Sequence, residues 1–312
     1  MSTPIIYLGL DIAKASLDLS PHPGLTPLVF SNDAAGHGRL LAALGRLPGP
    51  VQIVCEASGG YEQGVLAALQ QAGVAVSLLN PRRARDFARA RGLLAKTDRL
   101  DAAALAAYGT VLRPAPTPPR SPLQQRLAAL VGRRQELLGL LTQERLRSEH
   151  HREAFVCRQA ARLQRLLEKY LIEVEAQIAA LVQSDGGLAA RVQRLCAVQG
   201  VGRRTAWLLL AALPELGTLR RGQAAALAGV APYNHDSGPY RGQRHVAHGR
   251  PLARQALYMA ALVAARCNPV LRPVYLRLRQ QGKPAKVALV ALMRKLVELA
   301  NRLLQRPEFQ IT

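Results

Sequence analysis

A cluster of five prolines within eleven residues is the local feature that most constrains how this chain can fold. They stand in LRPAPTPPRSP, residues 112–122, where proline removes backbone N–H donors and disfavours both helix and interior strand. Such a segment is extended and stiff, so it predicts a linker over residues 113–122 between separately folded parts. The chain has 312 residues, which is long enough for more than one hydrophobic core.

The residues before the linker, 1–112, alternate in type. Short apolar runs typical of strands are followed by patterns with helical spacing, and the order is three strands, helix, strand, helix, strand and then two helices. The expected strands are residues 5–10, 16–20, 27–30, 50–57 and 74–79, and the expected helices are 35–44, 61–71, 82–94 and 98–112. This layout predicts an α/β domain with a mixed sheet, in the element order of a ribonuclease-H-like domain.

The residues after the linker lack this alternation. Residues 123–182 contain no proline, and their leucines recur every three or four positions, with a polar break at SEHHRE. This pattern predicts two long amphipathic helices over residues 123–184, packed as a coiled-coil-like pair or against a second subunit. A solvated bundle and a dimerising arm that holds nucleic acid both fit it. Residues 185–312 are expected to form a mostly helical C-terminal domain.

The formal charge of the chain is +22, and six of its 42 basic residues are lysine while 36 are arginine. The planar guanidinium suits bidentate contact with phosphate, so a nucleic acid is the first partner that the charge predicts. The four cysteines are far apart and have no histidine at metal-ligand spacing, which indicates a reducing compartment and no structural zinc. The longest apolar stretch, residues 256–265, is too short to span a bilayer. We therefore expect a cytoplasmic protein with no membrane partner.

Acidic residues are scarce in this chain, and four of them occupy positions that suggest a metal site. Asp11 ends the first strand, Glu56 ends the fourth, and Asp98 and Asp101 lie three apart on one face of a helix. Four carboxylates in a small space repel one another unless cations neutralise them, and a pair of Mg²⁺ ions about 3.5–4 Å apart is a common arrangement for displacement at phosphorus. Taken one by one, these residues could also be helix-end anions or strand-to-loop turns. The other acids considered, Asp18, Asp33, Glu62 and Asp86, fit no such geometry.

A second candidate feature is the turn in LCAVQGVGRRTAWLLLAAL, residues 195–213. Gly200 and Gly202 leave backbone N–H groups accessible at the start of a helix, and Arg203 and Arg204 follow directly. Helix-hairpin-helix elements contact nucleic-acid phosphates through such a loop, although a tight helix connection would give the same pattern.

The third feature is a solitary serine, Ser237, the only serine after Ser184. It stands between Asp236 and Gly238 in a segment of turn-forming residues, and an ordinary Asx-type turn is the simplest interpretation. An exposed serine near cations can also attack a phosphate if its proton is removed and the developing charge is stabilised. The candidate groups for those roles are three arginines and three histidines: Arg241, Arg244, Arg250, His235, His245 and His248.

These residues together resemble a known family, the DEDD insertion-sequence transposases. The resemblance rests on GLDIAK, CEASGGYE, KTDRLDA, QGVGRRTA and the long block GVAPYNHDSGPYRGQRHVAHGRPLARQALYMAALVAARCNPV, continuing to KVALVALMRKL. It runs over nearly the whole chain and is weakest in the helical middle. Members of the family combine a RuvC-like N-terminal domain with a serine-containing C-terminal transposase domain, and they are recombinases guided by a bridge RNA.

The resemblance implies a role for each candidate residue. Asp11, Glu56, Asp98 and Asp101 would bind Mg²⁺, and Ser237 would attack the scissile phosphate of DNA. A structured RNA encoded by the element would pair with both DNAs, and the subunits would assemble as a dimer or tetramer. The chain departs from many relatives in having Gln199 where they have proline and a single serine where they have a pair.

Two other functions remain open at this stage. One is a metal-dependent endonuclease of the junction-resolving kind, in which the acids activate water and Ser237 is structural. The other is a non-catalytic nucleic-acid scaffold whose acids only cap helices.

Overall fold

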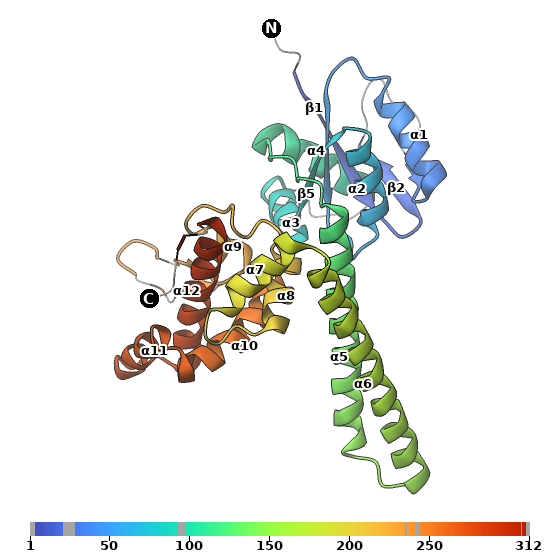
Figure 1. The fold of residues 1–312 in the computed structure, drawn as a ribbon. Helices are drawn as coiled ribbons and strands as arrows, with labels where there is room; N and C mark the ends of the chain where they lie inside the picture. Colours follow the sequence, from blue (N-terminus) through green and yellow to red (C-terminus); the bar gives the residue numbers. More distant parts are fainter. Residues whose placement is uncertain are drawn as a thin grey trace. The chain divides into compact units, whose positions relative to one another are not determined.

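The computed structural model describes residues 4–20, 29–92, 98–234, 236–240, 242, 244–306 and 308–309, with the side chains of residues 98–100 left out. The chain divides into two compact units, Met1–Pro119 and Arg120–Thr312. The division falls inside the proline-rich segment (Figure 1). Each unit is described by itself below.

The first unit is built on a mixed five-stranded sheet. Its strands are β1 (Ile6–Ile12), β2 (Ser16–Leu19), β3 (Val29–Ser31), β4 (Val51–Glu56) and β5 (Ala75–Leu79). They are ordered β3-β2-β1-β4-β5, with antiparallel pairing between the first three in sequence and parallel pairing of β1 with β4 and of β4 with β5. The predicted order of strands and helices is confirmed.

Helices cover both faces of this sheet. They are α1 (Ala34–Leu44), α2 (Glu62–Gln71), α3 (Pro81–Ala90) and α4 (Asp98–Leu112). Side chains of α1 and α2 share a core with Leu8, Leu10 and Ile53 of the sheet. Side chains of α3 and α4 share a smaller core with Val54 and Leu79. Successive residues of a strand therefore alternate between an α1/α2 face and an α4 face.

Two glycines allow α4 to lie directly on β1. A Cβ at Gly9 of β1 would collide with the backbone of α4 at Ala102, and a Cβ at Gly109 of α4 would meet Tyr7 and Val54 at less than 3.0 Å. No other residue type could occupy Gly9 at this helix-to-strand distance.

The proline-rich segment is attached to the edge of the first unit. Gln52 and Ser77 are buried polar residues on neighbouring strands, and Gln52 Nε2 donates to Ser77 Oγ at 2.9 Å and to the carbonyl of Pro114 at 2.6 Å. The backbone N–H of Thr117 donates to Val76 of β5, and its hydroxyl accepts from the N–H of Leu78. Hydrogen bonds thus fix the start of the segment to β5. Thr117 supplies the backbone N–H donor, which a proline at the same position would lack.

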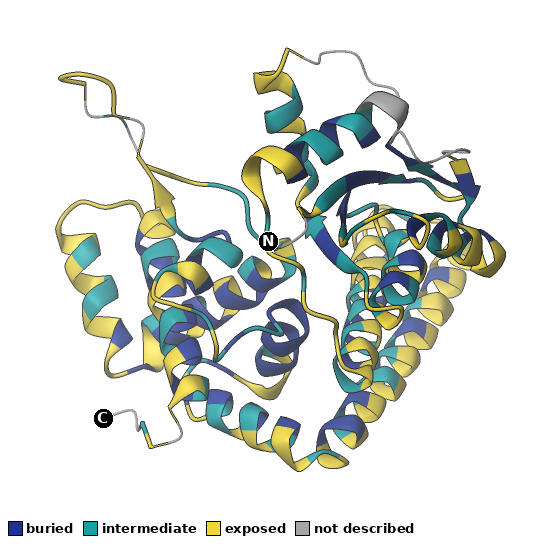
Figure 2. Ribbon diagram, turned by 90° about the horizontal axis from the view of Figure 1, so that it is seen from above, coloured by how far each residue is buried: buried dark blue, intermediate teal, exposed yellow. Residues whose placement is uncertain are grey.

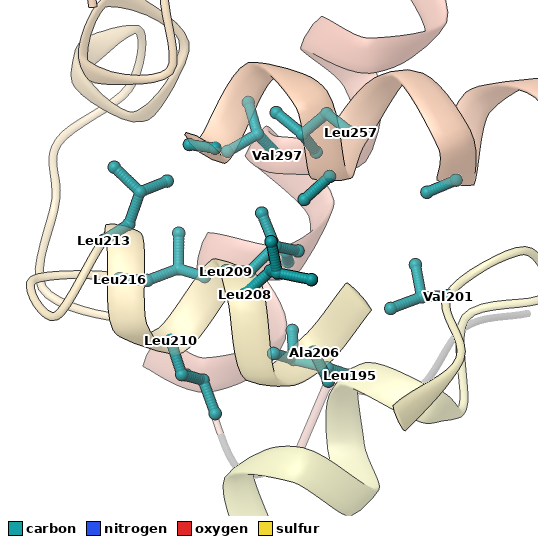
Figure 3. Packing of buried hydrophobic residues seen from close by; sticks show 14 of the residues in the cluster. Leu195, Val201, Ala206, Leu208, Leu209, Leu210, Leu213, Leu216, Leu257 and Val297 are labelled. Atoms are coloured by element: carbon teal, nitrogen blue, oxygen red, sulfur yellow. The ribbon is translucent and has the colours of Figure 1, made fainter. Parts of the chain in front are cut away.

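The second unit is almost entirely helical. Its elements are α5 (Pro122–Ser148), α6 (Ala154–Gln183), α7 (Gly186–Cys196), α8 (Arg203–Ala212), α9 (Gln223–Leu227), β6 (Pro232–Tyr233), β7 (His245–Val246), α10 (Pro251–Cys267), α11 (Leu271–Gln280) and α12 (Ala285–Gln305). The leucine spacing predicts two long helices, and these are α5 and α6, which form an antiparallel hairpin (Figure 1). The base of this hairpin shares a core with α7, α8, α10 and α12, to which α8 contributes seven consecutive buried residues, Ala206 to Ala212 (Figure 3).

A buried ion pair joins the two hairpin helices, and an exposed arginine of α8 binds the same carboxylate. Arg134 Nε donates to Glu175 Oε1 at 2.8 Å, and Arg204 donates to the other carboxylate oxygen at 2.7 Å. Burial alone would raise the pKa of Glu175, but the hydrogen bonds from the two arginines outweigh it and hold the pKa below its usual value. Removing either the acid or Arg134 would leave a buried charge without its partner.

Within the described ranges, no helix is long and apolar enough to cross a membrane. The four cysteines are free, and burial raises the pKa of Cys55 to about 12, so that its thiol stays protonated at neutral pH.

The glycine contact between β1 and α4 gives a first prediction. We expect Gly9→Ala to lower the free energy of unfolding by about 3 kcal/mol, the upper end of the usual cost of overpacking, because the methyl group meets helix backbone rather than a flexible side chain. Gly38→Ala in α1 is the matched control, since a Cβ there has nothing within 4 Å and alanine favours helix. Urea unfolding of both variants measures the difference. Equal stability of Gly9→Ala and the wild-type chain would contradict the packing.

Candidate functional site

Asp11 lies on the face of the sheet that α4 covers. Gly9 contacts α4, whereas Leu8, Leu10 and Ile12 belong to the core beneath α1 and α2, so Asp11 follows Gly9 on the α4 face. The side chain is half-buried near the end of β1.

Glu56 lies beside it on the neighbouring strand. Leu10 pairs with Cys55 in the parallel register of β1 and β4, so the next residues, Asp11 and Glu56, are level with each other. Ile53 and Cys55 join the core on the α1/α2 face and Val54 the core beside α4, which places Glu56 on the α4 face as well. Adjacent strands are about 4.8 Å apart, so the backbones of the two acids are close neighbours.

The first turn of α4 lies at the same end of the sheet. Gly109 contacts Tyr7, and the middle of the helix, at Ala102 and Ala106, contacts Gly9. The helix therefore runs antiparallel to β1, and its N-terminal turn lies toward the Asp11 end. Asp98 and Asp101 occupy that turn, at helical spacing from the sheet-facing residues Ala102 and Leu105. The side chain of Asp98 is outside the described part.

Asp18, for which the sequence predicts no place in the metal site, is a neighbour of Asp11 in the sheet. Asp18 of β2 is paired directly opposite Asp11 in the antiparallel register. Residues paired in this way place their Cβ atoms about 4.5–5.5 Å apart on the same face of the sheet. This position depends on strand register, which spacing along the chain does not show.

The other three excluded acids do have structural roles. Asp33 caps α1 by accepting from the N–H of Gly36 at 2.7 Å. Glu62 accepts three hydrogen bonds, from the N–H and hydroxyl of Ser58 and from the N–H of Gly60. Asp86 pairs with Arg82 within α3 at 4.0 Å.

The chemistry of this set of acids fits a hard divalent cation. All are carboxylates, the ligand type that Mg²⁺ takes in proteins. Asp11, Asp18 and Glu56 share one face of the sheet, and Asp101 lies in the first turn of α4. Among the described side chains no three potential ligands are close enough to hold a metal ion. The described geometry therefore brings the acids to one region without forming a closed set of ligands.

Ser237 lies at the tip of an exposed β-hairpin in the second unit. Ser237 and Tyr240 exchange both backbone hydrogen bonds at 3.0 Å around a two-residue loop. Gly238 in that loop has φ 55°, and proline at position 239 fixes φ near −65°, a combination that corresponds to a type II′ turn. The described residues of the segment between β6 and β7 are almost all exposed (Figure 2). The predicted exposed turn is thus present.

The base of this hairpin is tightly fixed. Gly229 and Gly249 both have positive φ, and a Cβ on either would collide with backbone on the other side. Arg250 makes a bidentate ion pair with Glu215 at 2.7 Å and donates to the carbonyl of Ala212 at 2.8 Å. His248 is held at φ 61°, and its ring packs edge-to-face on that of Tyr233, with 5.6 Å between the ring centroids. A rigid base therefore supports an exposed tip.

The candidate phosphate-binding arginines differ in what they contact. Arg250 is engaged with Glu215, and Arg244 is exposed. Arg241 falls outside the described residues, as does His235. His245 lies in β7, and His248 lies at the hairpin base with a buried Nδ1 that has no hydrogen-bond partner in the described part of the chain.

The Gly-Val-Gly segment connects α7 to α8. Gly200 has φ 105°, and a Cβ there would meet α10 at Ala264 at 2.9 Å, so this glycine is required for helix packing. Gly202, by contrast, precedes α8 with open space around it, and the first residues of α8, Arg203 and Arg204, are exposed. Arg204 is paired with Glu175. The side of the segment formed by Gly202 and Arg203 is the part left accessible for a phosphate.

Comparison with known proteins covers both units. A transposase family model of the DEDD, IS110 type matches residues 8–156, and a model described as transposase of the IS116/IS110/IS902 family matches residues 192–276. Pilin gene-inverting proteins of Moraxella bovis and Moraxella lacunata are each 27% identical over 309 residues, which is 96% of this chain and 96% of theirs. A probable family 20 transposase of Pseudomonas aeruginosa is 33% identical over 148 residues, 45% of this chain and 42% of its own. Two transposase matches in succession, with relatives along the whole chain, show that the protein belongs to the IS110 family of transposases and is a DNA recombinase.

Proposed function

We propose that the protein excises and inserts its own insertion sequence through a metal-binding acidic site in the first unit and a serine nucleophile in the second. The observation that carries the proposal is the placement of Asp11 and Glu56 at one end of the α4 face of the sheet, toward the first turn of α4. A strand order of β3-β2-β1-β4-β5 around such acids supports a ribonuclease-H-like, RuvC-like domain.

Asp11, Glu56, Asp98 and Asp101 would hold the cations, two Mg²⁺ ions in our proposal. Bound there, the cations would neutralise charge on the scissile phosphate and favour the ionised form of the attacking oxygen. Asp18 contributes a further negative charge beside Asp11, and we assign it a supporting role in the affinity for cations.

Ser237 would supply the attacking oxygen. The bond between its Oγ and the phosphorus forms as the bond from phosphorus to one deoxyribose oxygen breaks. The serine proton passes to a base or to solvent, and the leaving oxygen takes up a proton. A hydroxyl of another strand then displaces the serine, so one phosphodiester is exchanged for another without an external energy source. The position of Ser237 on an exposed turn with a fixed base supports this role, since a bulky duplex can approach it.

The net charge of +22 supports a guide RNA in addition to DNA, because several phosphate backbones would have to be held at once. Gly200, Gly202, Arg203, Arg204, Arg241, Arg244 and Arg250 are the residues we propose for such contacts. Of these, Gly202, Arg203 and Arg244 are exposed among the described residues and have no ion pair within them.

The helical hairpin supports self-association. On α6 four exposed apolar residues, Phe155, Leu163, Leu166 and Tyr170, fall on one side of the helix, within about 80° at 100° per residue. The buried residues of α6, such as Leu167 and Ile178, form a different stripe that faces α5 and the core of the second unit. The helix α6 thus has one apolar stripe that is covered within the chain and a second that is exposed. An exposed stripe of this kind is typical of a contact between copies of the chain, here a dimer or tetramer.

Substitution of the acids tests the metal site. We expect Asp11→Asn to reduce Mg²⁺-dependent DNA cleavage by about 100-fold or more, because a direct ligand is lost, while nucleic-acid binding persists. Asp18→Asn should raise the Mg²⁺ concentration needed for half-maximal cleavage by about 10-fold and leave cleavage at saturating Mg²⁺ near normal. Asp86→Asn is the control that removes the same charge from α3. Cleavage by Asp11→Asn at the wild-type rate would refute the site.

Substitution of the serine separates strand transfer from hydrolysis. Ser237→Ala should abolish cleavage and leave folding and RNA binding unchanged, because an exposed turn loses only a hydroxyl. Tyr240→Phe, which removes another exposed hydroxyl from the same turn, should remain active. The reaction contains the element's ends, its RNA and Mg²⁺, and mass spectrometry should find DNA on the peptide containing Ser237. An alanine variant that still cuts would assign the chemistry to activated water, as in a junction-resolving endonuclease.

Charge placed on the exposed stripe of α6 tests self-association. We expect Leu166→Glu to lower the mass measured by light scattering after gel filtration, because a carboxylate would be buried in the contact. Ile172→Glu is the matched control, since Ile172 is 69% exposed on another side of the same helix. Identical masses for the wild-type chain and both variants would contradict the contact.

A further inference from the structure

We propose that the first unit holds a phosphodiester of a nucleic-acid strand in a cleft between β5, the start of α3 and the end of α4, with Arg83 and Arg113 as its ligands. The cleft has a volume of about 470 Å³, and all of its lining residues lie between Ser77 and Ala115, within the first unit. This inference rests on the proposed function in one respect, namely that the partner is a nucleic acid.

The cleft combines cationic and apolar surfaces. Arg83 and Arg113 line it together with Leu79, Tyr108 and Leu112. Leu112 is 51% exposed, so an apolar group could pack on it without displacing any part of the protein. A nucleotide unit has this mixed character, with a charged phosphate and flat apolar base faces.

The donors in the cleft have no partners among the described residues. Neither guanidinium, of Arg83 or of Arg113, makes a hydrogen bond or ion pair there, and neither does the hydroxyl of Tyr108. This differs from Arg134, Arg204 and Arg250, each of which is engaged with a carboxylate. A guanidinium group that has no carboxylate partner is suited to bidentate contact with phosphate oxygens.

The backbone holds Arg113 in an unusual conformation at the edge of the cleft. Its φ is 43°, in the left-handed region that few non-glycine residues adopt. The next residue, Pro114, is fixed by the hydrogen bond from buried Gln52 to its carbonyl, and the N–H of Arg113 bonds to the carbonyl of Gly109. These hydrogen bonds hold the backbone of Arg113 in place at the edge of the cleft.

The outer surface of α3 extends the positive charge. Ala84 and Phe87 pack inward on the small core. The rings of Phe87 and Tyr108 pack edge-to-face, with 5.1 Å between their centroids. The opposite side carries Arg82, Arg85 and Arg89, which are three and four residues apart and all exposed. A strand with one phosphate in the cleft would therefore find further cations along the helix.

One end of the cleft is close to the acids and the other is far from them. Leu79, which lines the cleft, pairs with Glu56 in the parallel register of β4 and β5. Asp101 is in the first turn of α4 and Leu112 at its end, eleven residues later, which is about 16 Å along a helix. Arg113 and Leu112 are therefore distant from the acidic first turn of α4, and we assign the cleft a role in binding only.

The test measures how the affinity of the full chain for nucleic acid depends on salt. The variant is Arg83→Gln combined with Arg113→Asn, because asparagine tolerates the left-handed conformation and the fold should persist. Two labelled probes are used, a single-stranded oligouridine RNA and a DNA duplex of the same length. For the RNA, we expect the slope of log affinity against log salt to become shallower by about 1.4, or about 0.7 for each lost contact.

A control variant removes the same charge elsewhere in the first unit. It combines Arg39→Gln and Arg46→Gln, both on or beside α1, and its slope should match that of the wild-type chain. Photocrosslinking with thiouridine-containing RNA should label a peptide containing Tyr108 or Arg113. A shallower slope with the duplex alone would assign the cleft to DNA rather than RNA.

A cleft variant whose slopes equal those of the control with both probes would overturn the inference. DNA cleavage is not a readout here, so that result would leave the acids and Ser237 untouched, and an inactive Ser237→Ala chain would not alter the slopes.

Discussion

The contact between Gly9 of β1 and the backbone of α4 is the constraint on which the candidate site depends. It sets how closely the helix lies on the sheet, and Gly109 allows the same close approach toward the other end of the helix. Because Asp11 follows Gly9 by two residues on the same face, this packing puts the acid end of β1 toward the acidic first turn of α4. A larger side chain at either glycine would move the helix, and the acids with it, even though neither glycine takes part in any chemistry.

A similar backbone contact supports the second candidate site. Gly229 and Gly249 allow two chain segments to touch at the base of the serine hairpin, and the Arg250–Glu215 ion pair fixes the start of α10 beside them. Burial alone would raise the pKa of Glu215, but the hydrogen bonds from Arg250 hold it below its usual value, so the pair stays charged at neutral pH. Both units therefore use glycine to bring rigid backbone together, and the candidate site residues lie just beyond the contact.

Much of this arrangement could be predicted from the sequence, because local patterns determine it. The strand and helix order follows from apolar periodicity, the long hairpin from leucine spacing, and the exposed turn from Gly238 and the proline after it. The place of Asp18 opposite Asp11 could not be predicted, since it depends on strand register, which is set by pairing between segments. The same holds for Arg250, whose pairing with Glu215 joins residues 35 apart in sequence, and for the cleft at Arg113, which requires the proline-rich segment to fold back on β5.

The central claim is that the acids on the α4 face form a cation site, and Mn²⁺ tests it most directly because it takes the same oxygen ligands as Mg²⁺ and scatters X-rays anomalously. Crystals of the full chain grown with Mn²⁺ should show one or two anomalous peaks about 2.1–2.2 Å from carboxylate oxygens of Asp11 and Glu56, beside the first turn of α4. Crystals with no peak at these residues at saturating Mn²⁺, or with peaks only at other carboxylates, would contradict the account.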